Sequence, residues 1–389
     1  MMSNLKNALL LSGGGARAAY QIGVMKAISD YSTNVIDNNK KIFDIFCGVS
    51  AGGINALDLA CGNDDPVAAV NRLVKKWQNF HVDQVYRTDN ISIIRNAYPW
   101  LKTLIPFQKN KHSTNSPMSF LDNSPLKSML DTIPYERVQQ LIDLKQLYAC
   151  SITCSSYHTG QSVTFFEGDN DIKEWDKELR IGVRYKLNTD HLLASSALPM
   201  IFPAQKIKSE WFGDGSMRQQ APLSPAIHLG ADRILVIGTG KNAQFNSRSL
   251  VNSEITLPMT DKPYPSLAQI GGHILNGLFV DNLFSDIDRL NRTNEMLKRL
   301  NKIDDIPIRN VDLLIINPSR KIDEVASQFV HELPKSILKL LSRIGATERL
   351  GGGLASYLLF ESSYCKELIQ IGYEDAWKQR KEIGDFLKI

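Results

Sequence analysis

The stretch Gly48-Val49-Ser50-Ala51-Gly52-Gly53 lies between two apolar segments, and the rest of the chain is organised around it. The run 42–47 before it predicts a buried strand, and the run 54–60 after it predicts a helix. A serine on a sharp strand-to-helix turn is a nucleophile elbow, which places its hydroxyl at a strand end, beside the positive end of a helix dipole. The same short pattern also occurs in plain turns before helices, so other segments must decide between the two interpretations.

A second turn, Ser12-Gly13-Gly14-Gly15-Ala16-Arg17, joins a predicted strand at 8–11 to a helical pattern at 18–28. Backbone N–H groups at such a helix N-terminus form an anion site, which suits a phosphate or a reaction oxyanion. A tight turn without a ligand is the third interpretation. A P-loop needs Gly-Lys-Ser/Thr, and this chain has Arg17-Ala18-Ala19 there. The spacing also disfavours a dinucleotide site.

A third turn, Asp214-Gly215-Ser216, follows the apolar residues Trp211 and Phe212. The apolar run 233–238 predicts an interior strand of a parallel or mixed sheet, and 147–154 predicts a strand with a hairpin partner at 162–166. Because sites in open α/β sheets form at one edge, we expect the three turns to meet at the same rim. There Asp214 can take a proton from a serine, and the glycine loop can supply oxyanion donors.

Composition limits the function further. Of 389 residues, 43% are hydrophobic and 22% are charged, as in an ordinary globular protein. The formal charge of +4 is too mild for nucleic-acid binding but compatible with an anionic membrane surface. The five cysteines fit neither a disulfide framework nor a metal site, and we expect buried, reduced thiols. No window predicts a signal peptide or a transmembrane helix, so we expect a cytoplasmic protein that contacts membranes transiently. The sequence shows no acidic loop of EF-hand spacing, and we expect no metal or cofactor.

The chain divides by composition near residue 245. We expect a catalytic domain at 1–245 and a mostly helical extension at 246–389, which contributes one strand, 311–317, to the main sheet. The aromatic and proline-rich segment 91–111 is interpreted either as a lid or lipid-facing patch or as ordinary core. The basic amphipathic segment 336–344 faces either the core or a membrane surface.

Four segments, in this order, resemble the patatin-like phospholipases over roughly residues 7–240. They are Gly13-Gly14-Gly15-Ala16-Arg17-Ala18 at the family's oxyanion loop, Gly48–Gly52 at its nucleophile elbow, 194–203 at its small-residue segment broken by prolines, and Asp214-Gly215-Ser216 at its catalytic aspartate. Two residues depart from the family pattern: Ala18 stands where the loop motif ends in glycine, and Ser216 replaces a glycine or small apolar residue.

The resemblance implies a three-layer α/β/α fold with a mainly parallel central sheet. It implies a Ser50–Asp214 dyad without histidine, with an oxyanion held by backbone N–H groups. The implied oxyanion donors are Gly13, Gly14 and Gly15, and the implied supporting residues are Arg17, Gly48, Gly52 and Gly215. Arg17 is interpreted as steering an anionic headgroup, bracing the loop or forming a structural ion pair.

The implied substrate is a phospholipid or lysophospholipid, cleaved at a fatty-acyl ester. Two alternatives are an acyltransferase that uses the same acyl-enzyme and a non-catalytic lipid-binding regulatory protein. A triad would need a histidine after its acid in chain order, which His273 and His331 satisfy. His273 lies in a helical pattern, however, and the dyad is favoured.

Overall fold

The computed structural model describes residues 5–35, 41–89, 119–240, 264–299, 309–343 and 352–389, with residues 92, 95 and 345. The segment 91–111, apart from residues 92 and 95, and the stretch 241–263 lie outside the described residues. The expectation of a lid therefore stays a prediction.

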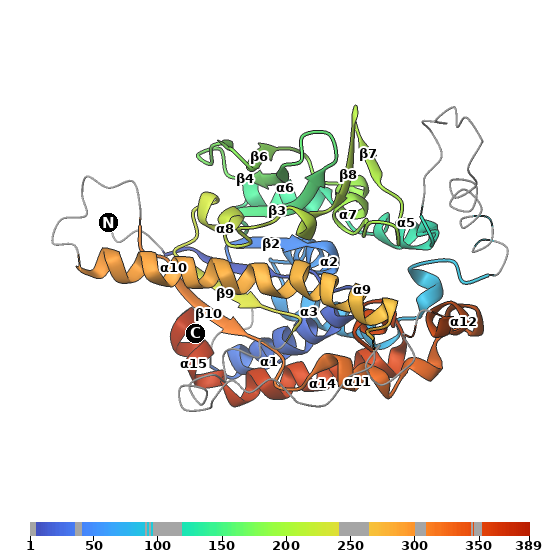
Figure 1. The fold of residues 1–389 in the computed structure, drawn as a ribbon. Coiled ribbons are helices and arrows are strands. Elements are labelled where there is room, and N and C mark those ends of the chain that lie inside the picture. The colour runs from blue at the N-terminus through green and yellow to red at the C-terminus, as the bar shows by residue number, and fades with distance from the viewer. Residues whose placement is uncertain are drawn as a thin grey trace.

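Ten strands of the described chain form one sheet (Figure 1). They are β1 (Asn7–Leu11), β2 (Ile45–Val49), β3 (Ala149–Ser156), β4 (Ser162–Gly168), β5 (Trp175–Lys177), β6 (Arg180–Arg184), β7 (Gln205–Ile207), β8 (Glu210–Asp214), β9 (Arg233–Ile237) and β10 (Asp312–Ile316). The order is β10-β9-β1-β2-β3-β4-β6-β5, with β8 paired to β3 and β7 paired to β8. The five strands from β10 to β3 are all parallel, whereas β4 and β8 are antiparallel to β3.

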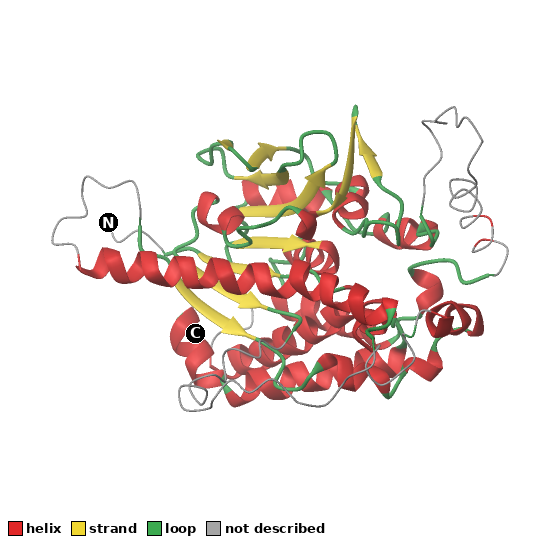
Figure 2. Ribbon diagram, in the orientation of Figure 1, coloured by secondary structure: helices red, strands yellow, loops and turns green. Residues whose placement is uncertain are grey.

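Helices cover both faces of this sheet, as Figure 2 shows. In the first part of the chain they are η1 (Gly15–Ala18), α1 (Ala19–Val35), α2 (Ser50–Ala60), α3 (Pro66–Gln78), η2 (Val82–Gln84), α5 (Ser124–Leu130), α6 (Glu136–Asp143), α7 (Thr189–Ser195), η3 (Gly215–Met217) and α8 (Ser224–His228). The residues of β1 and β2 are buried throughout, as expected for interior strands covered on both sides. The fold is therefore the predicted three-layer α/β/α arrangement with a mainly parallel sheet.

The C-terminal part of the chain is mostly helical. Its helices are α9 (Leu267–Asn276), the π-helix η5 (Gly277–Asp281), α10 (Asn282–Arg299), α11 (Ile322–Ser327), η6 (Val330–Glu332), α12 (Lys335–Arg343), α13 (Gly352–Leu358), α14 (Ser362–Lys378) and α15 (Arg380–Leu387). Several of its elements contact the first part directly. Among them, β10 extends the sheet beside β9, and α14 packs along α1, where the Tyr20 hydroxyl donates to Asp375 at 3.2 Å. The domain boundary predicted at 245 lies outside the described residues and stays a prediction.

Two local predictions are refined. The apolar residues before the turn predicted at 214–216 belong to the strand β8, which runs up to Asp214, and the chain turns in η3. The apolar side of α12 faces inward, since Ile337 and Leu341 are buried, while Lys335, Lys339 and Arg343 are exposed. The short strands β5, β6 and β7 were not predicted, because three to five residues carry little periodic signal.

Candidate active site

Ser50 lies on a sharp turn between β2 and α2. Val49 ends the strand in an extended conformation, and Ser50 is the first residue of the helix. Its φ of 54° is in the left-handed region, which costs a serine energy and persists only where the surroundings enforce it. The turn is tight enough that a Cβ on Gly52 would come within 2.3 Å of the Ser12 carbonyl oxygen, so α2 touches the glycine loop there.

The small-residue segment that begins in the last turn of α7 holds this strained turn in place. The Ser50 N–H donates to Ser195 Oγ at 2.8 Å, and Ser195 Oγ in turn donates to the Thr153 carbonyl oxygen of β3 at 2.6 Å. Two residues further on, the Ala197 carbonyl oxygen accepts a hydrogen bond from the Asp214 N–H at 2.9 Å. One short segment therefore fixes the backbone at both Ser50 and Asp214.

Asp214 reaches Ser50 from the opposite direction along the sheet. The parallel strand β2 ends with Val49 opposite Thr153 of β3, and the antiparallel strand β8 ends with Asp214 opposite Cys154. The two strands thus meet end to end beside β3, at adjacent positions of its register. The predicted convergence at one rim is found, although Asp214 arrives on a strand that runs antiparallel to β1, β2 and β3.

The Asp214 carboxyl group is fully buried. Its Oδ1 accepts a hydrogen bond from the Ser216 N–H at 2.9 Å, whereas its Oδ2 has no hydrogen-bond partner among the residues described. Burial raises the pKa of Asp214 to about 6, and the nearby Ser50 hydroxyl and Ser216 N–H oppose this rise. Ser50 thus lies near the carboxyl without a formed hydrogen bond, a frequent state of catalytic pairs without substrate.

The glycine loop begins where β1 ends. Gly14 precedes η1, and Gly15 has a φ of 55°, with the Tyr357 carbonyl oxygen only 2.2 Å from the position of a Cβ. Only a glycine fits there. Within the described chain, the N–H groups of Gly13, Gly14 and Gly15 donate to no other protein group, and the Gly13 carbonyl oxygen accepts from the Thr239 hydroxyl at 2.6 Å. The loop therefore presents free donors on a backbone that its neighbours hold.

Arg17 braces this loop from inside the protein. Its side chain is only 2% exposed and bonds to Ser356, to Asn276 and to the Gly353 carbonyl oxygen, and it forms an ion pair with Asp323. The guanidinium also lies 3.8 Å from the centre of the Tyr357 ring. Of the three interpretations of Arg17, this geometry fits a brace built on an ion pair; a buried guanidinium with these partners is not placed to meet a headgroup.

A mainly apolar cavity of about 40 Å³ opens beside Ser50. The described residues that line it include Gly15, Ser50 and Ala51, together with two polar side chains, Asn55 and Lys76. Its apolar wall comprises Ile54, Leu73, Trp77, Phe80, Val85, Leu126, Met129, Leu198, Phe202, Tyr357 and Phe360. Ser196 also lines the cavity, and its buried hydroxyl has no hydrogen-bond partner among the described residues. Gly13 instead borders a separate small cavity with Gly48 and Ser216.

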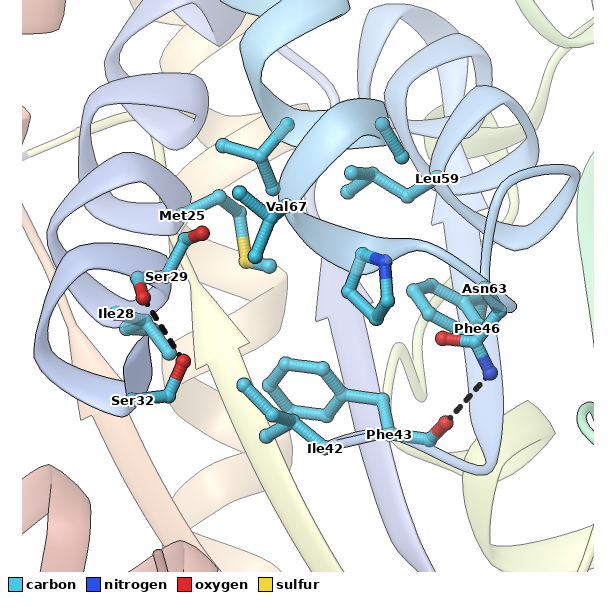
Figure 3. A pocket seen from close by; sticks show the side chains of 13 residues that line it. Met25, Ile28, Ser29, Ser32, Ile42, Phe43, Phe46, Leu59, Asn63 and Val67 are labelled. Carbon is cyan, nitrogen blue, oxygen red and sulfur yellow. Dashed lines mark hydrogen bonds between the residues drawn. The ribbon is translucent and has the colours of Figure 1, made fainter. Parts of the chain in front are cut away.

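Another apolar pocket lies at the far end of β2 and α2 (Figure 3). It is bordered by Met25 and Ile28 of α1, by Phe43 before β2 and by Leu59 near the end of α2. The Asn63 side chain there donates to the Phe43 carbonyl oxygen at 3.0 Å. The described residues lining this pocket include no titratable side chain, so it offers no acid–base chemistry, and we place the candidate site at Ser50.

Among the described residues, no histidine lines the cavity at Ser50, and no group of His, Cys, Asp or Glu side chains could hold a metal ion. His273 is exposed on α9 and His331 is exposed in η6. His191 is buried, and burial lowers its pKa to about 4 while its Nδ1 bonds with Asn188, so it is a neutral core residue. All five cysteines are free and buried, as expected.

Four supporting residues were not predicted individually. Ser195, Ala197 and Thr239 position the backbone of the site, and Tyr357 walls the glycine loop. Ser195 and Ala197 belong to the small-residue segment 194–203, which carries part of the family resemblance, but no role was predicted for either residue. No pattern in the sequence marks Thr239 or Tyr357.

The comparisons with known proteins agree with the motifs. The family model "Patatin-like phospholipase" matches residues 9–227, more than half of the chain, and the chain belongs to this family. No curated protein matches. Among solved structures, VipD from Legionella pneumophila has a TM-score of 0.39 and 13% sequence identity; the alignment covers 98% of this chain and 67% of that one. A chain of the ExoU–SpcU complex of Pseudomonas aeruginosa has a TM-score of 0.25 and 15% sequence identity; the alignment covers 98% of this chain and 58% of that one.

Membership of the family makes this chain a lipid acyl hydrolase by class, and its substrates are lipids. Within the described residues, no helix is long and apolar enough to cross a bilayer.

Proposed function

We propose that the protein hydrolyses a fatty-acyl ester of a phospholipid or lysophospholipid through Ser50 and Asp214. The observation that carries this proposal is the end-to-end meeting of β2 and β8 on β3, which brings a strained serine and a buried, incompletely hydrogen-bonded carboxylate together. A carboxyl whose pKa lies near 6 is mostly ionised at neutral pH, yet basic enough to take a proton. The apolar cavity beside Ser50 suits an acyl chain.

In the first step Ser50 Oγ attacks the ester carbonyl carbon while its proton passes to Asp214. The tetrahedral oxyanion is held by N–H groups of the glycine loop. Gly15, which lines the cavity, is the first candidate, and Gly13 and Gly14 are the neighbouring ones. The Ala51 N–H, in the first turn of α2, is a further candidate, because first-turn N–H groups have no partner within their helix.

Collapse of the tetrahedral state breaks the ester bond, and Asp214 returns its proton to the leaving alcohol oxygen. This leaves an acyl group on Ser50. A water then attacks the acyl carbonyl and gives a proton to Asp214, and the released Ser50 oxygen regains it as the fatty acid departs. No metal takes part in this proposal, and activity is expected to survive EDTA.

The cavity has little free volume, so an acyl chain enters only if its wall moves. The apolar wall is built by Met129, Phe202 and Phe360 among others, and such side chains can reorient without breaking hydrogen bonds. Peripheral contact with a membrane, where the substrate resides, is part of the proposal.

The Ser50→Ala variant tests the proposal. Hydrolysis of defined phospholipids and lysophospholipids, as well as labelling by a fluorophosphonate, should fall to background. Ser195→Ala is not a suitable control, because it removes the hydrogen bond that supports the turn at Ser50. The matched control is Ser342→Ala, since Ser342 is exposed at the end of α12. Retained hydrolysis in Ser50→Ala would contradict the assignment, and product analysis with an added lysolipid acceptor separates hydrolysis from acyl transfer.

A further inference from the structure

The helix α9 has two unlike faces. Its inner face packs on α13, with Gly272 against the backbone of Gly353 and Leu354, and its last residue, Asn276, bonds to Arg17 and to the Tyr357 hydroxyl. Its outer face presents Leu267, 69% exposed, and Ile274, 59% exposed. Ile270 lies between them at 38%, and Tyr264 just before the helix is 90% exposed.

We call these exposed apolar residues the α9 stripe: Leu267, Ile270 and Ile274 on the helix, with Tyr264 just before it in the chain. The positions 267, 270 and 274 recur at helical spacing, so they share one side of the helix. The helix itself carries no Lys, Arg, Asp or Glu. Contiguous exposed apolar side chains of this kind mark an interaction site more often than scattered ones do.

A basic helix borders the α9 stripe. Gly345, just after α12, lies against Ser266, the residue that caps α9, and Figure 1 shows both helices at the same end of the molecule. The exposed cations Lys335, Lys339 and Arg343 follow one another at four-residue spacing along α12. In the part of the chain described, none of them forms an ion pair. An apolar strip beside exposed cations is complementary to a bilayer whose surface is anionic.

We propose that the α9 stripe, flanked by the α12 cations, is the surface through which the protein docks on an anionic phospholipid bilayer. Tyr264, Leu267, Ile270 and Ile274 enter the interfacial region while the cations meet lipid phosphates. This inference deepens the proposed function and rests on it for its biological meaning, although docking itself is measurable without catalysis. The docking helix also contacts the brace of the glycine loop, because Asn276 at the end of α9 accepts a hydrogen bond from Arg17.

The test uses the full chain carrying Ser50→Ala, so that vesicles stay intact. Binding to vesicles of phosphatidylcholine with phosphatidylglycerol is measured by sedimentation, with pure phosphatidylcholine in parallel. Adding Leu267→Asp and Ile274→Asp should weaken binding about tenfold or more. The matched control is Met296→Asp on α10, a side chain 66% exposed, which should leave binding unchanged. A second pair, Lys339→Glu and Arg343→Glu, should remove the preference for the anionic vesicles, whereas Lys378→Glu with Lys381→Glu should not.

Four outcomes would overturn the docking surface. The first is unchanged vesicle binding in the Leu267→Asp, Ile274→Asp variant, and the second is an equal loss of binding in Met296→Asp. The third is a fall in Tm found only in the Leu267→Asp, Ile274→Asp variant, which would mean that another part of this chain covers the α9 stripe. The fourth is a wild-type dimer that this variant dissociates while its vesicle binding persists. Failure of the proposed function looks different: hydrolysis persists in Ser50→Ala while vesicle binding follows the α9 stripe. With Ser50 restored, the aspartate pair should hydrolyse a dissolved short-chain ester at the wild-type rate and membrane lipid more slowly.

Discussion

The region matched by the family model, residues 9–227, and the C-terminal region, residues 264–389, contribute to the candidate site in different ways. The first carries Ser50, Asp214 and the glycine loop. The second supplies what surrounds them: Asn276, Asp323 and Ser356 hold Arg17. The matched region thus carries the groups that would react, whereas the C-terminal region fixes the backbone that would hold the oxyanion. Truncation and substitution can show whether the contributions of the two regions are separable.

The largest effect is expected from separating them. A fragment of residues 1–245 should fail to fold, because it exposes the α1 face that α14 covers and leaves the edge of β9 unpaired. It also removes the C-terminal residues that hold the Arg17 side chain in place behind the glycine loop. Near-UV circular dichroism and urea unfolding provide the measurement. A cooperatively folding, active fragment would show that the matched region is an independent domain.

Within the matched region, Asp214→Asn should lower kcat/KM for lipid ester hydrolysis by about 10⁴-fold, because the amide cannot accept the serine proton. In the wild type, kcat/KM should rise with pH through about 6 and level off above it, since only the carboxylate is a base. A pH series on wild type and variant measures both. His273→Gln serves as the control; a comparable loss in that variant would favour a triad.

The same carboxyl gives a smaller effect on stability. Its folded pKa of about 6 lies above the roughly 3.8 of an exposed aspartate, so folding favours the protonated form. As the pH rises from about 4 to about 6, the free energy of unfolding should therefore fall, and this group should account for up to about 3 kcal/mol of the loss. Asp214→Asn should remove this fall and unfold at higher urea concentration than wild type at pH 8. Parallel urea curves at pH 4 and 8 are decisive; equal pH dependence in both proteins would contradict the assigned burial.

The smallest effect concerns the brace between the regions. Arg17→Lys keeps the charge but loses the planar fork that reaches several acceptors at once, so activity should fall about tenfold. Asp323→Asn, well outside the matched region, should act in the same direction by about 1 kcal/mol, since Asp323 is 43% exposed and solvent screens the pair.

A double-mutant cycle on Arg17 and Asp323, with kcat/KM as the readout, tests that coupling. Asp288→Asn, on an exposed ion pair of α10, is the matched control and should change nothing. Strictly additive effects of Arg17→Lys and Asp323→Asn would show that the C-terminal region does not act on the glycine loop through this pair.

Much of the fold and the candidate residues could be predicted from the sequence, because they rest on short-range signals. Ser50 stands between a strand pattern and a helix pattern, and the three glycines follow a strand. The direction in which Asp214 arrives could not be predicted, because antiparallel pairing of β8 with β3 joins residues about 60 positions apart. The partners of Arg17 lie 259 to 339 positions away in the chain and show no pattern that a single sequence reveals.

The end-to-end meeting of β2 and β8 also has a consequence for heat resistance. The backbones at both proposed reacting residues are tied to one interior strand: Val49, just before Ser50, pairs with Thr153 of β3, and Asp214 pairs with Cys154. This strand lies between other strands and is buried along its whole length. Interior strands exchange their amide hydrogens only when the whole molecule opens. Hence the spacing of Ser50 and Asp214 should survive until global unfolding, and thermal inactivation should coincide with the melting of the sheet rather than precede it.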